Sequence, residues 1–223
     1  MDFGTAVHAS CERYLRTRVI DVALCESKLV ELWKLNAKDN VDGYAEQPIE
    51  EWLVQARDIL AEVPKFLDDT FPNWEYVDAE HFLYEPIPSQ EQAFKGYIDA
   101  VISVKTRGKH VTWLLDWKTC GFGWNRYKRS DDLVLSQLKL YKTFWCTKMS
   151  VELASTRCGF VLLKRTAPSG SRCELVPVSV GEKTSKRTLK VVNNMLSSVK
   201  RGIALKNRDA CKWCDYRETK HCP

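Results

Sequence analysis

The sequence of 223 residues lacks the features that would place a protein in a membrane, a secretory pathway or a repeat array. No run approaches the roughly 20 consecutive apolar residues that a membrane-spanning helix requires. The first residues carry neither the basic nor the apolar stretch of a secretion signal, so we expect an intracellular, cytoplasmic protein. Internal repeats and low-complexity linkers are absent too, which favours one domain with a substantial core.

A closed disulfide framework is disfavoured because the nine cysteines are an odd number. A strong charge of one sign is also missing. The formal charge of +5 permits a polyanionic partner without establishing one. Basic residues do cluster at 105–109, at 126–129 and from Lys183 to Arg208. Each cluster alone is typical of a solvated surface, and only an adjacent acidic site would point to nucleic acid.

The apolar pattern predicts helices at both ends of the chain and strands between them. We expect helices over 5–35, 48–66, 131–146 and 183–204, and strands over 76–84, 95–104, 110–117, 158–164 and 173–180. Loops are expected at 39–43 and 121–130. This order predicts an α/β (α+β) fold with a central mixed sheet of about five strands flanked by helices.

We expect the chain to form a single domain, 1–223. Its N-terminal helices occupy 1–75, the sheet core 76–180, and the last helix with a cysteine-containing tail 181–223.

Two carboxylates and an ammonium group are the strongest chemical signal. Asp99 lies in one predicted strand, and Asp116 and Lys118 lie at the end of the next. Residues two apart in a strand share a face, so Lys118 and Asp116 should lie together while Trp117 points into the packing. Two carboxylates on adjacent strands suit a hard cation such as Mg²⁺, which stabilises charge on a phosphate and acidifies a bound water. The set therefore predicts phosphodiester hydrolysis.

Three further residues are candidates for the same site. Gln137 and Tyr141 are four apart on the following helix, so both project from one face and could contact a strand of nucleic acid or brace the metal. His8 lies in the first helix, and an imidazole ligand favours Mn²⁺ more than oxygen ligands alone do. Taken singly, an acid-x-Lys triplet is typical of a surface salt bridge, and the other residues are typical of ordinary helix surfaces.

Four segments in order resemble the motifs of the RecB-like branch of PD-(D/E)XK nucleases. They are Gly4–His8, Gly96–Asp99, Leu115–Thr119 and Gln137-x-x-x-Tyr141. The resemblance runs from residue 4 to the cysteine tail and implies a restriction-endonuclease-like core.

The resemblance also implies the roles of the residues. His8, Asp99, Asp116 and the backbone carbonyl of Trp117 would bind Mg²⁺ or Mn²⁺. Lys118 would assist the water, and Gln137 and Tyr141 would engage DNA or support the site. Glu80 resembles an additional acid of the family, and Glu85 competes for that role.

The tail has the pattern Cys211-x-x-Cys214-x7-Cys222, which suits a thiophilic metal. It resembles the tail of iron–sulfur nucleases, including CRISPR-associated and AddB-type enzymes, in which a fourth cysteine from before the histidine motif completes a [4Fe–4S] cluster. Here the last gap is wider, and no cysteine precedes His8. The fourth ligand could be Cys11 or Cys25. Alternatively, His221 could complete a zinc site, or the tail could bind no metal.

The leading hypothesis is a metal-dependent deoxyribonuclease, an exonuclease rather than an endonuclease, acting on DNA ends or single strands in recombination, repair or DNA processing. The loop residues Trp124, Arg126, Lys128 and Arg129 are candidate DNA contacts. Phe122, Trp124 and Tyr127 could stack on unpaired bases, or could equally be packing residues.

The alternative hypothesis is a non-catalytic DNA-binding or assembly component of a recombination or adaptation complex, with the tail as a structural metal clip. A redox role for Cys211 and Cys214 is disfavoured because the pair does not begin a helix after a strand. Because a helicase motif is absent, any unwinding would come from a partner such as a helicase, a recombinase or a single-strand-binding protein. We expect a cytoplasmic or nucleoid-associated protein, or one in the host cytoplasm if a virus encodes it. An oligomer remains an open expectation.

Overall fold

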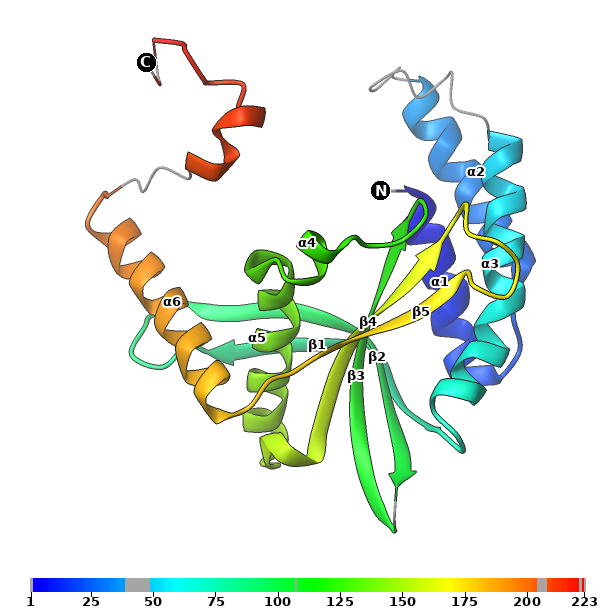
Figure 1. The fold of residues 1–223 in the computed structure, drawn as a ribbon, viewed down its shortest axis with the longest axis horizontal. Helices are drawn as coiled ribbons and strands as arrows, with labels where there is room; N and C mark the ends of the chain where they lie inside the picture. The colour runs from blue at the N-terminus through cyan, green and yellow to red at the C-terminus, as the bar shows by residue number, and fades with distance from the viewer. Residues whose placement is uncertain (1, 39–48, 107, 204–207, 221, 223) are drawn as a thin grey trace.

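The computed structural model describes residues 2–38, 49–106, 108–203, 208–220 and 222. Three N-terminal helices lead into five strands, with two long helices and a short one later in the chain (Figure 1). The helices are α1 (Asp2–Thr17), α2 (Val22–Lys38), α3 (Ile49–Thr70), α4 (Arg126–Arg129), α5 (Asp132–Met149) and α6 (Glu182–Lys200). The strands are β1 (Glu75–Pro86), β2 (Ala93–Thr106), β3 (Lys109–Cys120), β4 (Thr156–Lys164) and β5 (Cys173–Val178). Some predicted features lie outside the described residues: the loop at 39–43, the helix start at Pro48, Arg107, Ala204 and His221.

The strands form one five-stranded sheet in the order β1-β2-β3-β4-β5. β3 and β4 run parallel, and the other neighbouring pairs are antiparallel. α5 provides the crossover that the parallel pair requires. The predicted mixed sheet of about five strands with flanking helices is therefore confirmed. Within the described residues no helix is long and apolar enough to cross a membrane.

The prediction of a single helix over 5–35 is wrong, because the chain turns between α1 and α2. Arg18 has a φ of 61°, which ends α1. Asp21 then begins α2 by accepting a hydrogen bond from the backbone N–H of Leu24 (2.8 Å). The guanidinium of Arg18 lies 3.3 Å from the ring centre of Trp74 and holds this turn against the loop before β1. No glycine or proline marks the turn, so the apolar pattern runs through it.

Each face of the sheet has its own core. α1, α2 and α3 cover one face, and α5 and α6 lie on the other (Figure 1). Side chains of β3 alternate between the two cores: Leu115 and Trp117 pack with the N-terminal helices, and Leu114 packs with α5. The predicted direction of Trp117, into the packing, is thereby confirmed.

The sheet divides where β2 and β3 cease to pair. Their ladder ends at Ala100 opposite Leu115. Beyond it, β2 continues beside β1 as a two-stranded ribbon, whereas β3 continues beside β4 (Figure 1). At the division, the backbone N–H of Trp117 donates to the Asp99 carboxylate (2.7 Å). A side chain thus takes the place of a strand partner, and an opening forms between the two halves of the sheet.

Candidate active site

The division of the sheet brings together acidic and basic side chains from three elements. β2 contributes Asp99, β3 contributes Asp116 and Lys118, and α1 contributes His8. Lys118 Nζ lies 2.6 Å from Asp116 Oδ2, as expected for residues two apart on one strand. His8 Nδ1 lies 3.8 Å from Asp99 Oδ2. Since Asp99 also accepts the N–H that follows Asp116, the two carboxylates are neighbours across the opening.

Two glycines of the predicted motifs permit this convergence. A Cβ on Gly4 would lie 3.1 Å from the hydroxyl oxygen of Thr119, so the absence of a side chain lets α1 approach the end of β3. A Cβ on Gly96 would lie 2.5 Å from the Tyr141 ring, a distance at which atoms overlap. Gly96 therefore provides the space in which Tyr141 packs against β2.

Burial and like charge dominate the electrostatics of the two acids. Burial, followed by the charges of Asp116 and Glu80, raises the pKa of Asp99 to about 8, although the Trp117 N–H and Lys118 oppose the shift. Burial also raises the pKa of Asp116, against the lowering effect of Lys118. The Asp116 side chain is only 1% exposed, so little solvent screens these interactions.

His8 is held neutral at physiological pH. Burial, together with the nearby charge of Lys118, lowers the pKa of His8 to about 4. A neutral imidazole keeps a free lone pair and can act as a metal ligand. Its Nε2 atom is buried without a hydrogen-bond partner among the described residues.

A scan against profiles of protein families matches residues 1–222 to the PD-(D/E)XK nuclease superfamily. The chain belongs to this superfamily. A search among curated proteins found none that matches the sequence. Membership implies a nuclease, and therefore a hydrolase that acts on DNA; PD-(D/E)XK nucleases typically use Mg²⁺ or Mn²⁺.

The buried donor atoms of this PD-(D/E)XK chain suit such an ion. His8 Nε2 is buried without a hydrogen-bond partner among the described residues, and an unpartnered buried polar atom is costly unless a ligand satisfies it. Asp116 Oδ2 is buried as well, and its neighbour is Lys118 Nζ, 2.6 Å away. In the described part of the chain, no three His, Cys, Asp or Glu side chains are already gathered closely enough to hold a metal. Lys118 is the partner of Asp116 Oδ2 here, and this ion pair would compete with an ion held by the same carboxylate.

Gln137 and Tyr141 lie beside the acids on α5. Gln137 Nε2 donates to the Tyr141 hydroxyl (3.1 Å), which also hydrogen-bonds the backbone of Tyr97. Burial raises the pKa of Tyr141, and the charges of Asp116 and Asp99 act in the same direction. Tyr141 is thus close enough to feel both carboxylates, whereas Gln137 reaches them through Tyr141.

Of the two candidate additional acids, Glu80 lies at the site and Glu85 does not. Glu80 stands where β1 faces Asp99, with a φ of 51° that interrupts the regular strand. Partial burial and the charges of Glu12 and Asp116 raise the pKa of Glu80. Glu85 is farther along β1, where its carboxylate lies 3.4 Å from Lys148 Nζ.

The predicted DNA contacts in the loop after β3 differ in their exposure to solvent. Trp124 is only 7% exposed and packs on Phe160 (ring centres 5.0 Å apart), so its ring belongs to the core and is not available for stacking. The Arg129 guanidinium donates hydrogen bonds to the Trp124 carbonyl and to the Glu174 carboxylate. Arg126 and Lys128 are exposed on α4. Of the predicted stacking residues, Phe122 and Tyr127 are the exposed ones.

The two candidate fourth ligands, Cys11 and Cys25, lie apart from the cysteines of the tail. Cys11 and Cys25 are fully buried in the core under α1 and α2, and burial raises the pKa of Cys25 to about 12. They are neutral packing residues, and the described residues form no disulfide. The tail with Cys211, Cys214 and Cys222 lies beyond α6, on the other side of the molecule (Figure 1). Cys11 and Cys25 therefore do not fit as fourth ligands to the tail.

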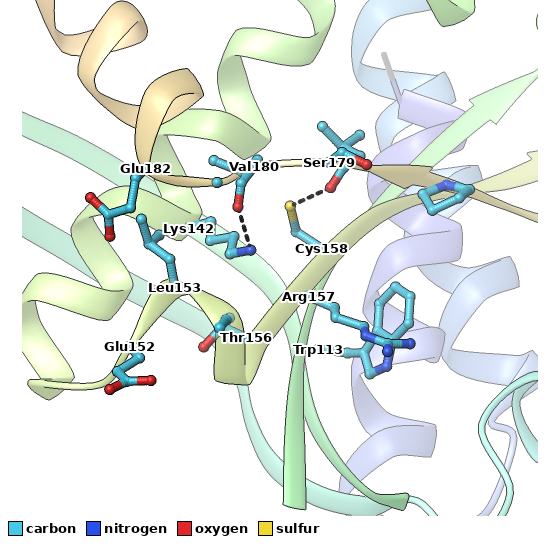
Figure 2. Close-up of a pocket in the computed structure, with 14 residues that line it drawn as sticks. Trp113, Lys142, Glu152, Leu153, Thr156, Arg157, Cys158, Ser179, Val180 and Glu182 are labelled. Carbon is cyan, nitrogen blue, oxygen red and sulfur yellow. Dashed lines mark hydrogen bonds between the residues drawn. The ribbon is translucent and has the colours of Figure 1, made fainter.

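A separate cavity of about 770 Å³ opens where β4 and α5 meet the start of α6 (Figure 2). Its buried amine, Lys142 Nζ, donates to the Val180 carbonyl (2.7 Å), and Cys158 donates to the Val178 carbonyl (3.4 Å). Neither acid of the site lines this cavity. Because Asp99, Asp116 and Lys118 all lie elsewhere, we assign this cavity no part in the chemistry.

The metal-free protein should lose stability as the pH rises from about 6.5 to about 8. In the folded protein Asp99 holds a proton that the unfolded chain has already released, so raising the pH favours unfolding by at most about 1.4 kcal/mol per pH unit. His8 has the opposite effect, but only at lower pH, between about 4 and 6.5. Urea unfolding in the presence of a chelator measures the slope.

Asp99→Asn should flatten this dependence of stability on pH. The control Asp132→Asn, at an exposed position, should leave the dependence unchanged, since Lys139 lowers the pKa of Asp132 and keeps its carboxylate ionised over the same pH range. An unchanged slope in Asp99→Asn would contradict the assignment of the buried proton to this site.

Gly96→Ala should reduce nuclease activity by displacing Tyr141, and should cost about 1–3 kcal/mol of stability through overpacking. Gly159→Ala is the matched control: its Cβ would lie 2.8 Å from Leu175, in the core away from Tyr141. Both variants should unfold at lower temperature, and only Gly96→Ala should lose activity at a temperature where both are folded. Equal losses of activity would mean that the space at Gly96 serves packing alone.

Proposed function

We propose that this protein is a divalent-metal-dependent deoxyribonuclease of the RecB-like branch, acting as an exonuclease on DNA ends or single strands. The observation that carries the proposal is the meeting of Asp99, Asp116, Lys118 and His8 at the division of the sheet. A histidine from the first helix beside the two acids is what the resemblance to that branch implies. Exposed aromatic and basic residues after β3 support a substrate with unpaired bases.

In the proposed mechanism, His8, Asp99, Asp116 and the Trp117 carbonyl hold Mg²⁺ or Mn²⁺, with Glu80 as a further acid. The ion would supply stabilisation of phosphate charge and a more acidic water. Ionising both carboxylates is unfavourable in the protein as described, so a cation held there would favour loss of the Asp99 proton. The role of Lys118 would be to orient the attacking water or the scissile phosphate with its ammonium.

Tyr141 and Gln137 support the site in this proposal. The Tyr141 ring fixes the position of β2 at Gly96, and its hydroxyl is close enough to feel both acids. Gln137 orients that hydroxyl. Arg126 and Lys128, exposed on α4, are the proposed contacts to the DNA backbone, whereas Arg129 positions the loop.

We further propose that Cys211, Cys214 and Cys222 bind a thiophilic metal, as zinc or as part of an iron–sulfur cluster. Cys211 and Cys214 lie in one tight turn, with the N–H of Cys214 donating to the carbonyl of Cys211 (3.4 Å). The fourth ligand comes from outside the N-terminal core, because Cys11 and Cys25 are enclosed there.

Asp116→Asn and Lys118→Met should each lower Mn²⁺-dependent cleavage of labelled linear DNA by about 100-fold or more. The matched pair Asp132→Asn and Lys139→Met removes an ion pair on α5 in which Asp132 is largely exposed, and should cleave as the parent does. Linear DNA labelled at either end, compared with circular DNA, separates exonuclease from endonuclease action. Parent-like cleavage by both site variants would refute the site, and a parent that never cleaves would favour the non-catalytic assembly role.

Protein purified without oxygen should contain iron or zinc that Cys214→Ser lowers and Cys25→Ala leaves unchanged, as measured by elemental analysis with absorbance spectra. The reason is that the Cys214 thiol is exposed, whereas Cys25 is fully buried in the apolar core. A parent free of both metals would show that the tail is not a metal site.

A further inference from the structure

We propose that three exposed aromatic side chains on the β1–β2 ribbon, Phe82, Tyr84 and Tyr97, form a stacking platform that leads single-stranded DNA to the acids. This platform rests on the proposed nuclease function and names the form of substrate that the same site takes. Phe82 and Tyr84 lie outside the four motifs. Tyr97 lies within the motif Gly96–Asp99, but the resemblance assigns no role to its side chain.

The register of the two strands places the three rings together. Phe82 pairs with Tyr97, and Tyr84 pairs with Lys95. The Phe82 and Tyr97 ring centres are 5.0 Å apart, and those of Phe82 and Tyr84 are 6.2 Å apart with planes only 19° from parallel. Directly opposite residues of an antiparallel pair share a face, which accounts for the cluster.

All three rings are exposed to solvent. Phe82 is 43% exposed, Tyr84 62% and Tyr97 46%. The alternate residues Leu83 and Ile98 are fully buried against α5, so the ribbon is anchored from its other face. The platform therefore keeps open ring surface without being needed for the core.

The platform continues directly into the acidic site. Tyr97 and Asp99 are two residues apart on β2 and project to one face, away from Gly96 and Ile98. On β1, Glu80 lies two residues before Phe82, at the end of the ribbon nearest the acids, and its pKa responds to the charge of Asp116. With about 3.4 Å per residue, Tyr97 lies about 7 Å along the strand from Asp99, and Tyr84, opposite Lys95, lies about 14 Å away.

These features select an unpaired strand over a duplex. Stacking needs a base whose face is uncovered, and in a duplex neighbouring base pairs cover those faces. Lys95 is exposed beside Tyr84 and supplies a positive charge for the backbone. The acids, the rings and Lys95 thus follow one another along the ribbon. This order suits a single DNA strand that enters the site with one end at the acids.

The test is the affinity of the full chain for a short fluorescein-labelled oligothymidylate, measured by fluorescence anisotropy in EDTA so that no cleavage occurs. Tyr84→Ala and Tyr97→Ala should each weaken binding about five-fold or more, and Tyr84→Phe and Tyr97→Phe should retain it because the ring is kept. Tyr76→Ala is the matched control, since Tyr76 is an exposed aromatic of the same strand (38%) beyond Glu80.

Affinity for a blunt duplex should be the same in all these variants. Parent-like binding of oligothymidylate by both alanine variants would overturn the platform, and so would an equal loss of duplex binding or an equal effect of Tyr76→Ala. A loss confined to Tyr127→Ala would place stacking on α4 instead. Tyr84 is the most exposed of the three rings, so its variant keeps the test decisive even if Tyr97→Ala fails to fold.

Failure of the platform and failure of the nuclease assignment are distinguishable. Binding in EDTA does not depend on hydrolysis, and Asp116→Asn tests hydrolysis without touching the rings. If cleavage depends on Asp116 while the rings prove irrelevant to binding, only the platform is refuted.

Discussion

The structure depends on one unfavourable arrangement, the burial of Asp99 and Asp116 beside each other. Like charges in a poorly solvated site oppose ionisation, which is why the pKa of Asp99 rises to about 8. Two local contacts make the arrangement tolerable: the Trp117 N–H on Asp99 and the ammonium of Lys118 on Asp116. Neither contact neutralises both acids. A divalent cation would neutralise both, which is the electrostatic basis of the proposed metal site.

The same carboxylate shapes the sheet. Where a regular ladder would pair β2 with β3, Asp99 accepts the Trp117 N–H and the strands part. The φ of 51° at Glu80 gives β1 a matching irregularity at the facing position. The opening and its acids are therefore one feature: the side chain that belongs to the site also separates the strands that form it.

Much of this was predictable, and the failures have physical causes. The apolar pattern predicted five strands, and residue spacing predicted that Lys118 and Asp116 share a face. The turn at Arg18–Asp21 was not predicted, because an aspartate cap and an arginine in the left-handed conformation replace the usual glycine or proline. The sequence did not decide whether Trp124 is buried, because a tryptophan beside arginine and lysine is typical of both a core and a surface. The division of the sheet depends on a side chain bonding to a distant backbone, which no local pattern records.

The segment Gly96-Tyr97-Ile98-Asp99 shows why a strand suits this site. Gly96 and Ile98 face α5, where one admits the Tyr141 ring and the other fills the core. Tyr97 and Asp99 alternate with them: the Tyr97 ring is 46% exposed, and the Asp99 carboxylate lies 3.8 Å from His8 Nδ1. Alternation thus assigns stability to one face and chemistry to the other within four residues. Because the buried pair fixes the backbone, the Tyr97 ring can remain uncovered, whereas the largely buried Asp99 carboxylate is supported by the Trp117 N–H.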